Sequence, residues 1–113
     1  SDVYKRQVYT YMDCDLDTRR ARRGGDYRIA VVKAGTGYDL IYLGGAEVNA
    51  GDWREGMRKG HVEPTVFQDN YTLRWADANG DAGFEGAWAS ITGAIMELHF
   101  PAESATLRFS REP

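Results

Sequence analysis

The sequence has very few of the residues that mark several common classes of protein. It contains one cysteine, three prolines and two histidines among 113 residues. A single cysteine cannot form an internal disulfide, so a disulfide-stabilised fold is excluded. The apolar runs are far shorter than the roughly 20 residues that a membrane-spanning helix needs. Positive charge is not in excess either, because 14 Lys and Arg face 17 Asp and Glu, and this balance argues against a nucleic-acid binder.

Motifs that carry catalysis or bind phosphate are missing as well. The chain has no G-x-S-x-G nucleophile elbow, and the glycines of residues 35–37 and 44–45 are not followed by the Lys-Ser/Thr pair and helix of a phosphate loop. Cys14 lies beside Asp13 and Asp15, whose negative charges disfavour a reactive thiolate. We therefore assign no catalytic residue, no metal ligand and no cofactor from the sequence.

Apolar and aromatic residues are plentiful. Hydrophobic residues make up 42% of the chain and aromatic residues 12%, with 13 glycines between them. This composition excludes a disordered tail, and a length near 100–150 residues is typical of one domain. We expect a small globular domain.

The first seven residues look foreign to the domain. Residues 1–7 read SDVYKRQ, which resembles the translation of a sequencing adapter, and such a segment is excluded from fold reasoning. We therefore expect residues 8–113 to form a single all-β domain, the C-terminal part of a longer protein. The alternative is that Val3 and Tyr4 belong to a genuine first strand.

The hydrophobic pattern predicts strands throughout. Large apolar residues alternate with polar ones in several segments, for example Leu73 and Trp75 around Arg74. Turn residues rich in glycine, asparagine and aspartate separate the segments. The predicted strands span residues 8–13, 27–33, 38–43, 57–67, 71–76, 84–91, 94–100 and 106–110, with one helical turn at 51–56.

Short sequential turns between about eight strands indicate an antiparallel up-and-down meander. Such a meander buries one face most simply by closing into a small barrel, which also removes exposed strand edges. The alternative is a two-sheet β-sandwich. We favour the barrel because every connection looks local and no crossover helix is visible.

A meander of this kind that contains Gly51-Asp52-Trp53 resembles the lipocalin-like, or calycin, class of small ligand-binding barrels. Residues 38–109 are also similar to small domains of uncharacterised bacterial proteins, through the phrases YDLIYL and W-x-x-G-M-x-K-G. The first resemblance implies a barrel that holds a small ligand. The second implies no activity.

Two charged segments have a functional and a plain interpretation. The cluster of arginines within residues 19–23 suits a contact with an acidic protein partner or with the phosphates of a polyanion, or a solvated hairpin loop. Residues 77–85 place oxygen-bearing side chains alternately, as a calcium loop does, but Ala82 and Trp88 occupy the positions of its glycine and final glutamate. A hairpin turn is the simpler interpretation of the second segment.

The aromatic residues are the main indication of a binding site. Rings near strand ends, with arginines close by, suit a small apolar ligand or a glycan that carries an acidic group. Core filling is the alternative role for the same rings. The predicted ligand-binding residues are Tyr42, Trp53, Arg74, Trp75, Trp88 and Arg108.

We therefore expect a non-catalytic binding or accessory module of a bacterial protein, with a secreted or envelope location favoured. Its partner is a small molecule, a glycan or another protein, with no nucleic acid. One alternative is a small hydrolase or lyase that uses His61 or His99 with nearby carboxylates. Another is a purely structural or assembly domain.

Overall fold

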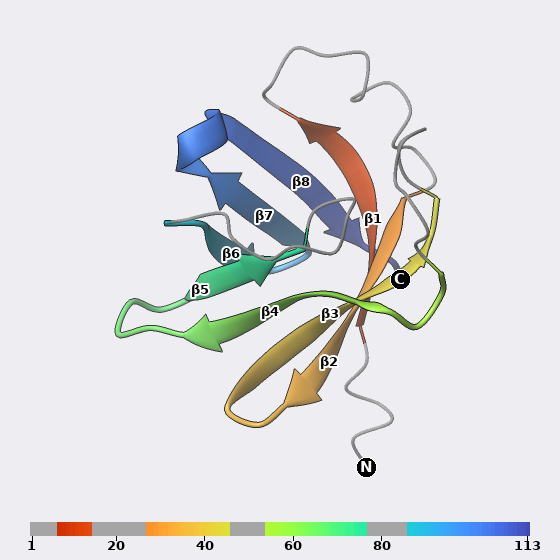
Figure 1. Ribbon diagram of the computed structural model, residues 1–113, viewed down its shortest axis with the longest axis horizontal. Coiled ribbons are helices and arrows are strands. Elements are labelled where there is room, and N and C mark those ends of the chain that lie inside the picture. Colours follow the sequence, from red (N-terminus) through yellow and green to blue (C-terminus); the bar gives the residue numbers. More distant parts are fainter. Residues whose placement is uncertain (1–6, 15–26, 46–53, 77–85) are drawn as a thin grey trace.

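Alternating apolar and polar side chains suit strands that bury one face, and the chain folds as eight of them. The computed structural model describes residues 7–14, 27–45, 54–76 and 86–113 (Figure 1). The strands are β1 (Gln7–Cys14), β2 (Arg28–Ala34), β3 (Gly37–Gly44), β4 (Arg58–Pro64), β5 (Asn70–Trp75), β6 (Trp88–Thr92), β7 (Ile95–Phe100) and β8 (Ala105–Arg111).

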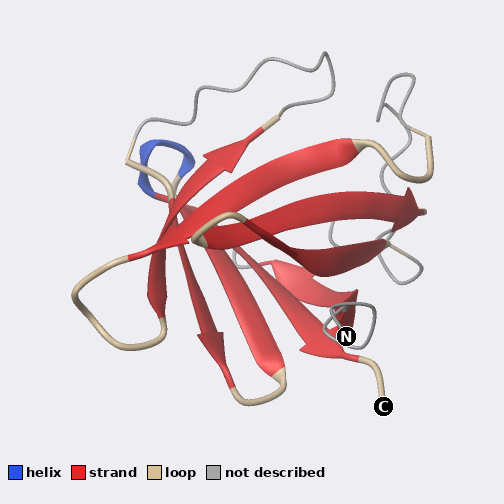
Figure 2. Ribbon diagram, turned by 90° about the horizontal axis from the view of Figure 1, so that it is seen from below, coloured by secondary structure: helices blue, strands red, loops and turns tan. Residues whose placement is uncertain are grey.

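The strands form one closed barrel. Each strand pairs antiparallel with the next in sequence, and β8 pairs with β1 to complete the ring. At that closing seam Tyr11 lies opposite Phe109, and both side chains are buried. The strands surround a common interior in both views (Figures 1 and 2). The predicted all-β meander closing into a barrel is confirmed, and the sandwich alternative is wrong.

Two strands are shorter than the sequence pattern predicts by more than one residue. β4 ends at Pro64, because Thr65 closes a tight turn with Asn70 that includes the apolar Val66 and Phe67. β6 begins at Trp88 rather than at residue 84. A single 3-10 turn (Pro101–Glu103) connects β7 and β8. In the described part of the chain, no helix is long and apolar enough to cross a bilayer.

The two ends of the barrel differ in their connections. At one end, which we call the hairpin end, β2 joins β3, β4 joins β5 and β6 joins β7, and the first residue of β1 also lies there. At the opposite end, β1, β3, β5 and β7 terminate. Gly93 supports the β6–β7 hairpin with a φ of +60°, a conformation that residues with a side chain rarely adopt.

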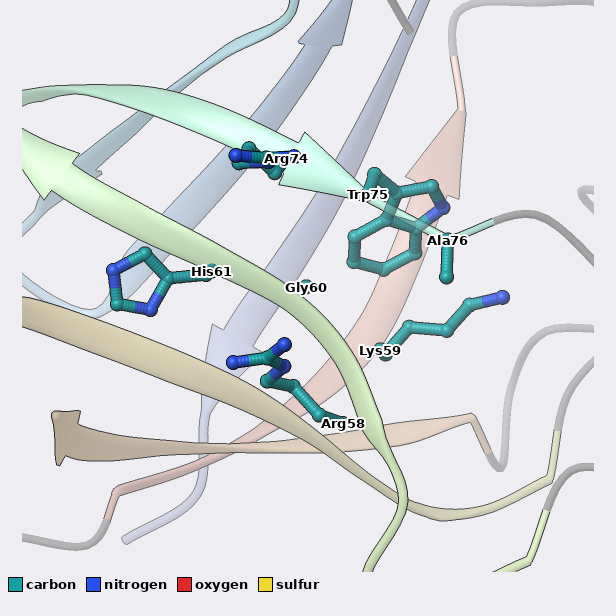
Figure 3. Close-up of a pocket in the computed structure, with 7 residues that line it drawn as sticks. All are labelled: Arg58, Lys59, Gly60, His61, Arg74, Trp75 and Ala76. Atoms are coloured by element: carbon teal, nitrogen blue, oxygen red, sulfur yellow. The ribbon is translucent and has the colours of Figure 1, made fainter. Parts of the chain in front are cut away.

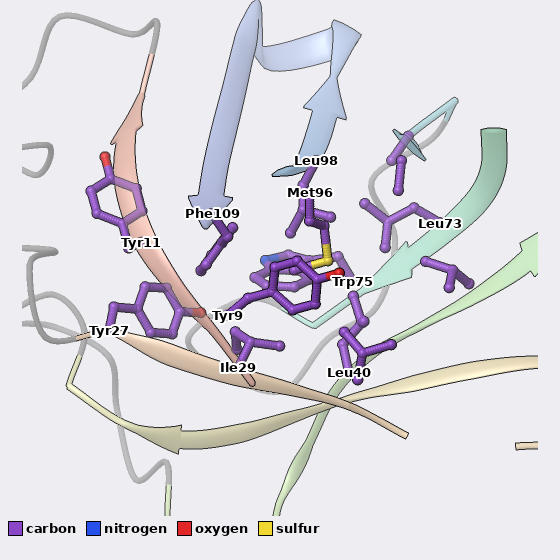
Figure 4. Packing of buried hydrophobic residues seen from close by; sticks show 14 of the residues in the cluster. Tyr9, Tyr11, Tyr27, Ile29, Leu40, Leu73, Trp75, Met96, Leu98 and Phe109 are labelled. Atoms are coloured by element: carbon purple, nitrogen blue, oxygen red, sulfur yellow. The ribbon is translucent and has the colours of Figure 1, made fainter. Parts of the chain in front are cut away.

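Side chains fill the middle of the barrel. Phe109, Ile29, Leu40, Met96, Leu98 and Val62 are the largest fully buried residues. Aromatic rings surround them, and Phe109 packs edge-to-face against Tyr11 and Tyr27 (Figure 4). The interior is therefore a packed core over much of its length, as is usual for a barrel of eight strands.

A bulge in β4 changes which side chains face outward. Leu40 of β3 pairs with Gly60, whereas the next residue, Ile41, pairs with Arg58, so Lys59 is the extra residue. Strict alternation from the inward-facing Gly60 would turn Arg58 into the barrel. The extra residue instead leaves Arg58 on the outer wall and buries Lys59 over the Trp75 ring.

Candidate functional site

A pocket opens between inward-facing side chains at the hairpin end of the barrel. Its volume is about 450 Å³, which is within the range of small-molecule sites. Five strands contribute to it, namely β1, β2, β3, β5 and β6. We call it the tyrosine pocket, and it is lined by Gln7, Tyr9, Val31, Lys33, Tyr38, Tyr71 and Ile91.

Three phenols and one ammonium group give this pocket its chemistry. Tyr38 and Tyr71 meet edge-to-face with their ring centroids 6.2 Å apart, and the Lys33 Nζ lies 4.9 Å from the Tyr38 ring centroid. Burial raises the pKa of both Tyr9 and Tyr71, so these phenols stay neutral and can donate hydrogen bonds. None of the lining residues is acidic. The lining residues therefore offer apolar ring faces and one positive charge, on Lys33.

The predicted site residues divide between the interior and the outer wall. Tyr42 and Trp75 are buried, and both lie near the opposite end of the barrel from the tyrosine pocket. The Tyr42 hydroxyl donates to the carbonyl oxygen of Gly45, and Trp75 packs edge-to-face with Phe100. These two rings belong to the packed core. Trp53 lies outside the described residues.

The other three predicted residues face away from the interior. Arg74 is exposed on β5, opposite His61 of β4. Arg108 donates from Nε to Glu97 Oε2 over 2.9 Å on the outer wall of β7 and β8. Trp88 is 38% exposed and stacks on His99 with 3.8 Å between ring centroids. The structure therefore does not bring the predicted set together around one pocket.

His61 lies between two carboxylates on the outer wall. Its Nδ1 is 2.7 Å from Asp39 Oδ1, and its Nε2 is 2.5 Å from Glu63 Oε2. Thr36 donates to the other oxygen of Glu63, which extends the network to the β2–β3 turn. Hydrogen bonds to Glu63 and Asp39 raise the pKa of His61. Both ring nitrogens are engaged, so neither is free to take a proton from a substrate.

His99 lies on a different part of the outer wall. Its Nδ1 is 3.2 Å from the Thr106 hydroxyl, and its buried Nε2 is 3.4 Å from Glu97 Oε1 without hydrogen-bond geometry. The stacked Trp88 ring covers one face of the imidazole. The main contact of His99 is therefore the stacked Trp88 ring, whereas the main contacts of His61 are two carboxylates.

Several sequence-based interpretations fall on residues that the structure does not describe. These are the arginine cluster at 19–23, the calcium-like segment at 77–85 and the G-x-W element at 51–53. Among the residues that are described, no group of three or more His, Cys, Asp or Glu side chains is arranged to hold a metal ion.

The tyrosine pocket was not predicted as a site, although its residues carried a signal. Alternation placed Tyr71 on the same face as Leu73 and Trp75, and all three do face inward. The rings that line a pocket cannot be told from those that fill a core by alternation alone, since both point inward. Whether an inward-facing ring lines the pocket or fills the core depends on its position along the strand.

No protein-family model matches this sequence, and comparisons with curated proteins and with solved structures find no match either. The functional assignment therefore depends on the geometry of the chain itself.

Proposed function

We propose that this barrel is a non-catalytic binding module, similar in design to lipocalin-like barrels, that holds a small and mainly apolar ligand in the tyrosine pocket. The observation that carries the proposal is the pocket itself, which is about 450 Å³ in volume and lined by side chains that point into the barrel. Small-ligand sites are typically concave, mostly apolar and supplied with a few placed polar groups.

The lining favours a ligand that combines a ring or short acyl chain with an acidic group. The faces of Tyr38 and Tyr71 offer apolar contact to a flat body, while Lys33 supplies a cation that no acidic lining residue opposes. The acidic group was expected to meet Arg74 or Arg108, but both lie on the outer wall. Lys33 takes over that role in this proposal.

A fluorescent ring compound with a sulfonate, 1-anilinonaphthalene-8-sulfonate, is a suitable probe. Calorimetric titration of the intact chain should give saturable binding of one probe molecule. The substitution Ile91→Trp places a large ring in the pocket and should weaken the binding at least about tenfold, which corresponds to the loss of a few buried contacts.

The matched control is Thr92→Trp, which adds the same ring one residue further along β6. Thr92 is exposed, and alternation turns it to the outer wall. This variant should bind the probe as the parent chain does. Equal binding by both variants, or equal loss in both, would contradict the assignment of the ligand to the tyrosine pocket.

A further inference from the structure

A second hollow, of about 400 Å³, lies along β4 and β5 on another part of the barrel (Figure 3). It shares no lining residue with the tyrosine pocket. Its lining is rich in basic side chains and contains no acidic one. The lining residues are Arg58, Lys59, Gly60, His61, Arg74, Trp75 and Ala76.

The bulge at Lys59 creates this arrangement. Because the bulge leaves Arg58 on the outer wall, Arg58 and His61 lie on the same side of β4, and Arg74 lies directly across from His61 on β5. A Cβ atom at position 60 would come within 2.6 Å of the Arg74 carbonyl oxygen, so glycine lets the two strands approach closely there. Backbone irregularity thus gathers three cationic groups beside two closely paired strands.

The guanidinium groups in this hollow have spare hydrogen-bonding capacity. Arg74 is exposed. Its side chain forms no hydrogen bond or ion pair with any of the described residues. Arg58 is 66% exposed, and its closest acidic contact among the described residues is 3.7 Å, from Nη1 to Asp39 Oδ1. Each guanidinium carries five N–H donors in a planar fork, which matches the oxygens of phosphate and carboxylate groups.

Among the described residues, two carboxylates lie near the hollow but do not line it. Asp39 approaches His61 from β3, and Glu63 lies two residues further along β4, whereas Arg74 approaches from β5. Hydrogen bonds to Glu63 and Asp39 raise the pKa of His61, which favours its charged form. Among the described residues, three basic side chains of the hollow, Arg58, His61 and Arg74, therefore outnumber the two adjacent carboxylates.

We propose that Arg58 and Arg74, on either side of His61, form a binding site for a phosphate oxyanion, either inorganic phosphate or the phosphate group of a small monoester. The two guanidinium groups donate hydrogen bonds to the phosphate oxygens. His61 pairs with its own carboxylates, and Trp75 and Ala76 also line the hollow (Figure 3).

An NMR titration of the amide signals with inorganic phosphate, at pH 6.5 and constant ionic strength, tests this site. The expected result is saturable binding with shifts confined to residues 58–61 and 74–76. Arg74→Gln and Arg58→Gln should each weaken the binding about tenfold or more, as loss of a charge-assisted hydrogen bond predicts. Arg74→Lys, which keeps the charge but loses the fork, should weaken it by less.

The control is Arg108→Gln, which removes the same charge from an outer-wall arginine that is already paired with Glu97. It should bind phosphate as the parent does. Equal weakening in all three glutamine variants would indicate a general charge effect and overturn the proposal, as would shifts that do not saturate. Amide spectra of the free variants establish that each is folded.

A parallel titration with phenyl phosphate identifies the source of the oxyanion. Stronger binding than that of phosphate, with added shifts at Trp75, favours a monoester, whereas weaker binding favours free phosphate. Absence of binding by both compounds overturns the site. That result would leave the tyrosine pocket untouched, because the two hollows have no residue in common.

Discussion

Phe109 and Arg108 are neighbours in β8, yet they experience opposite surroundings. Phe109 is fully buried and packs its ring between Tyr11 and Tyr27, with centroid distances of 5.8 and 5.6 Å. Arg108 lies on the outer wall and pairs with Glu97 across the sheet. The same contrast between interior and outer wall repeats around the barrel.

The two faces contribute to stability by different forces. Interior side chains lose water-exposed apolar area, which stabilises by about 25 cal/mol per Å². Outer-wall pairs stay partly hydrated, and exposed pairs of this kind contribute about 0–1 kcal/mol. The interior therefore decides whether the barrel folds, while the outer wall is free to vary its chemistry for binding and for pH response.

The largest effect is expected from Phe109→Ala. Removing a fully buried ring creates a cavity between β1, β7 and β8, and such changes lower the free energy of unfolding by about 3–5 kcal/mol. Urea denaturation followed by far-UV circular dichroism measures the loss. Ser110→Ala, one residue along on the outer wall, should change stability by less than about 0.5 kcal/mol. A similar loss in both variants would contradict the division between the faces.

A smaller effect is expected at the close approach between β3 and β4. A Cβ atom at Gly37 would lie 1.9 Å from the carbonyl oxygen of Val62, so Gly37→Ala forces the strands apart. Strain of this kind costs about 1–3 kcal/mol. Gly44→Ala is the control at the other end of β3, because no atom lies within 4 Å of its added Cβ. Equal urea midpoints for the two variants would rule out the steric account.

Alternation was enough to predict the strands and their order. Residues such as Ile29, Val31, Met96 and Leu98 recur at every second position, and a period of two has few interpretations other than a strand with one buried face. Local turns then restricted the topology to a meander. The barrel closure followed from the need to cover both sheet edges, and the pairing of β8 with β1 satisfies it.

The candidate sites could not be predicted in the same way. A bulge adds one residue without a distinctive sequence, so the outward turn of Arg58 beside His61 depends on pairing across strands. Three tyrosines that are far apart in the chain, Tyr9, Tyr38 and Tyr71, line the same pocket. They meet there only because of the pairing register of the strands in the closed barrel. Trp88 was expected to form an apolar wall and instead stacks on His99 outside the barrel.

The His61 network gives the outer wall a pH response that the apolar core lacks. The pKa of His61 is raised above 6.5 by Glu63 and Asp39, so its contribution to stability is fully present below pH 6.5 and is lost as the pH rises through the folded-state pKa. The pKa of Glu63 is lowered from 4.5, so its contribution is lost as the pH falls through its folded-state value. The network should therefore stabilise the folded barrel most strongly between about pH 4.5 and 6.5.

The substitution His61→Gln tests this window. The stability difference between the parent and the variant should be larger at pH 6 than at pH 9, with urea midpoints as the measurement. NMR titration of the ring protons should give a pKa above 6.5 for His61. A difference that does not change with pH would show that His61 acts only through packing.

The smallest effect is expected where Glu112 joins β1 and β2. Its carboxylate accepts from Arg28 Nε at 2.7 Å, from Arg28 Nη2 at 3.1 Å and from the Thr10 hydroxyl at 2.6 Å. These hydrogen bonds lower the pKa of Glu112 to about 2. The contribution of Glu112 to the stability of the fold is present above the ordinary pKa of 4.5 and is lost as the pH falls toward 2.

Glu112→Gln should therefore lower the urea midpoint slightly at pH 7, by less than Gly37→Ala does, because solvent screens this pair. The difference from the parent should shrink between pH 4.5 and 2. Asp69→Asn removes the same charge from an exposed turn and should change the urea midpoint at pH 7 by little. If Glu112→Gln matched Phe109→Ala in its cost, the outer wall would have to stabilise the barrel as strongly as the interior, and the contrast between the two faces would fail.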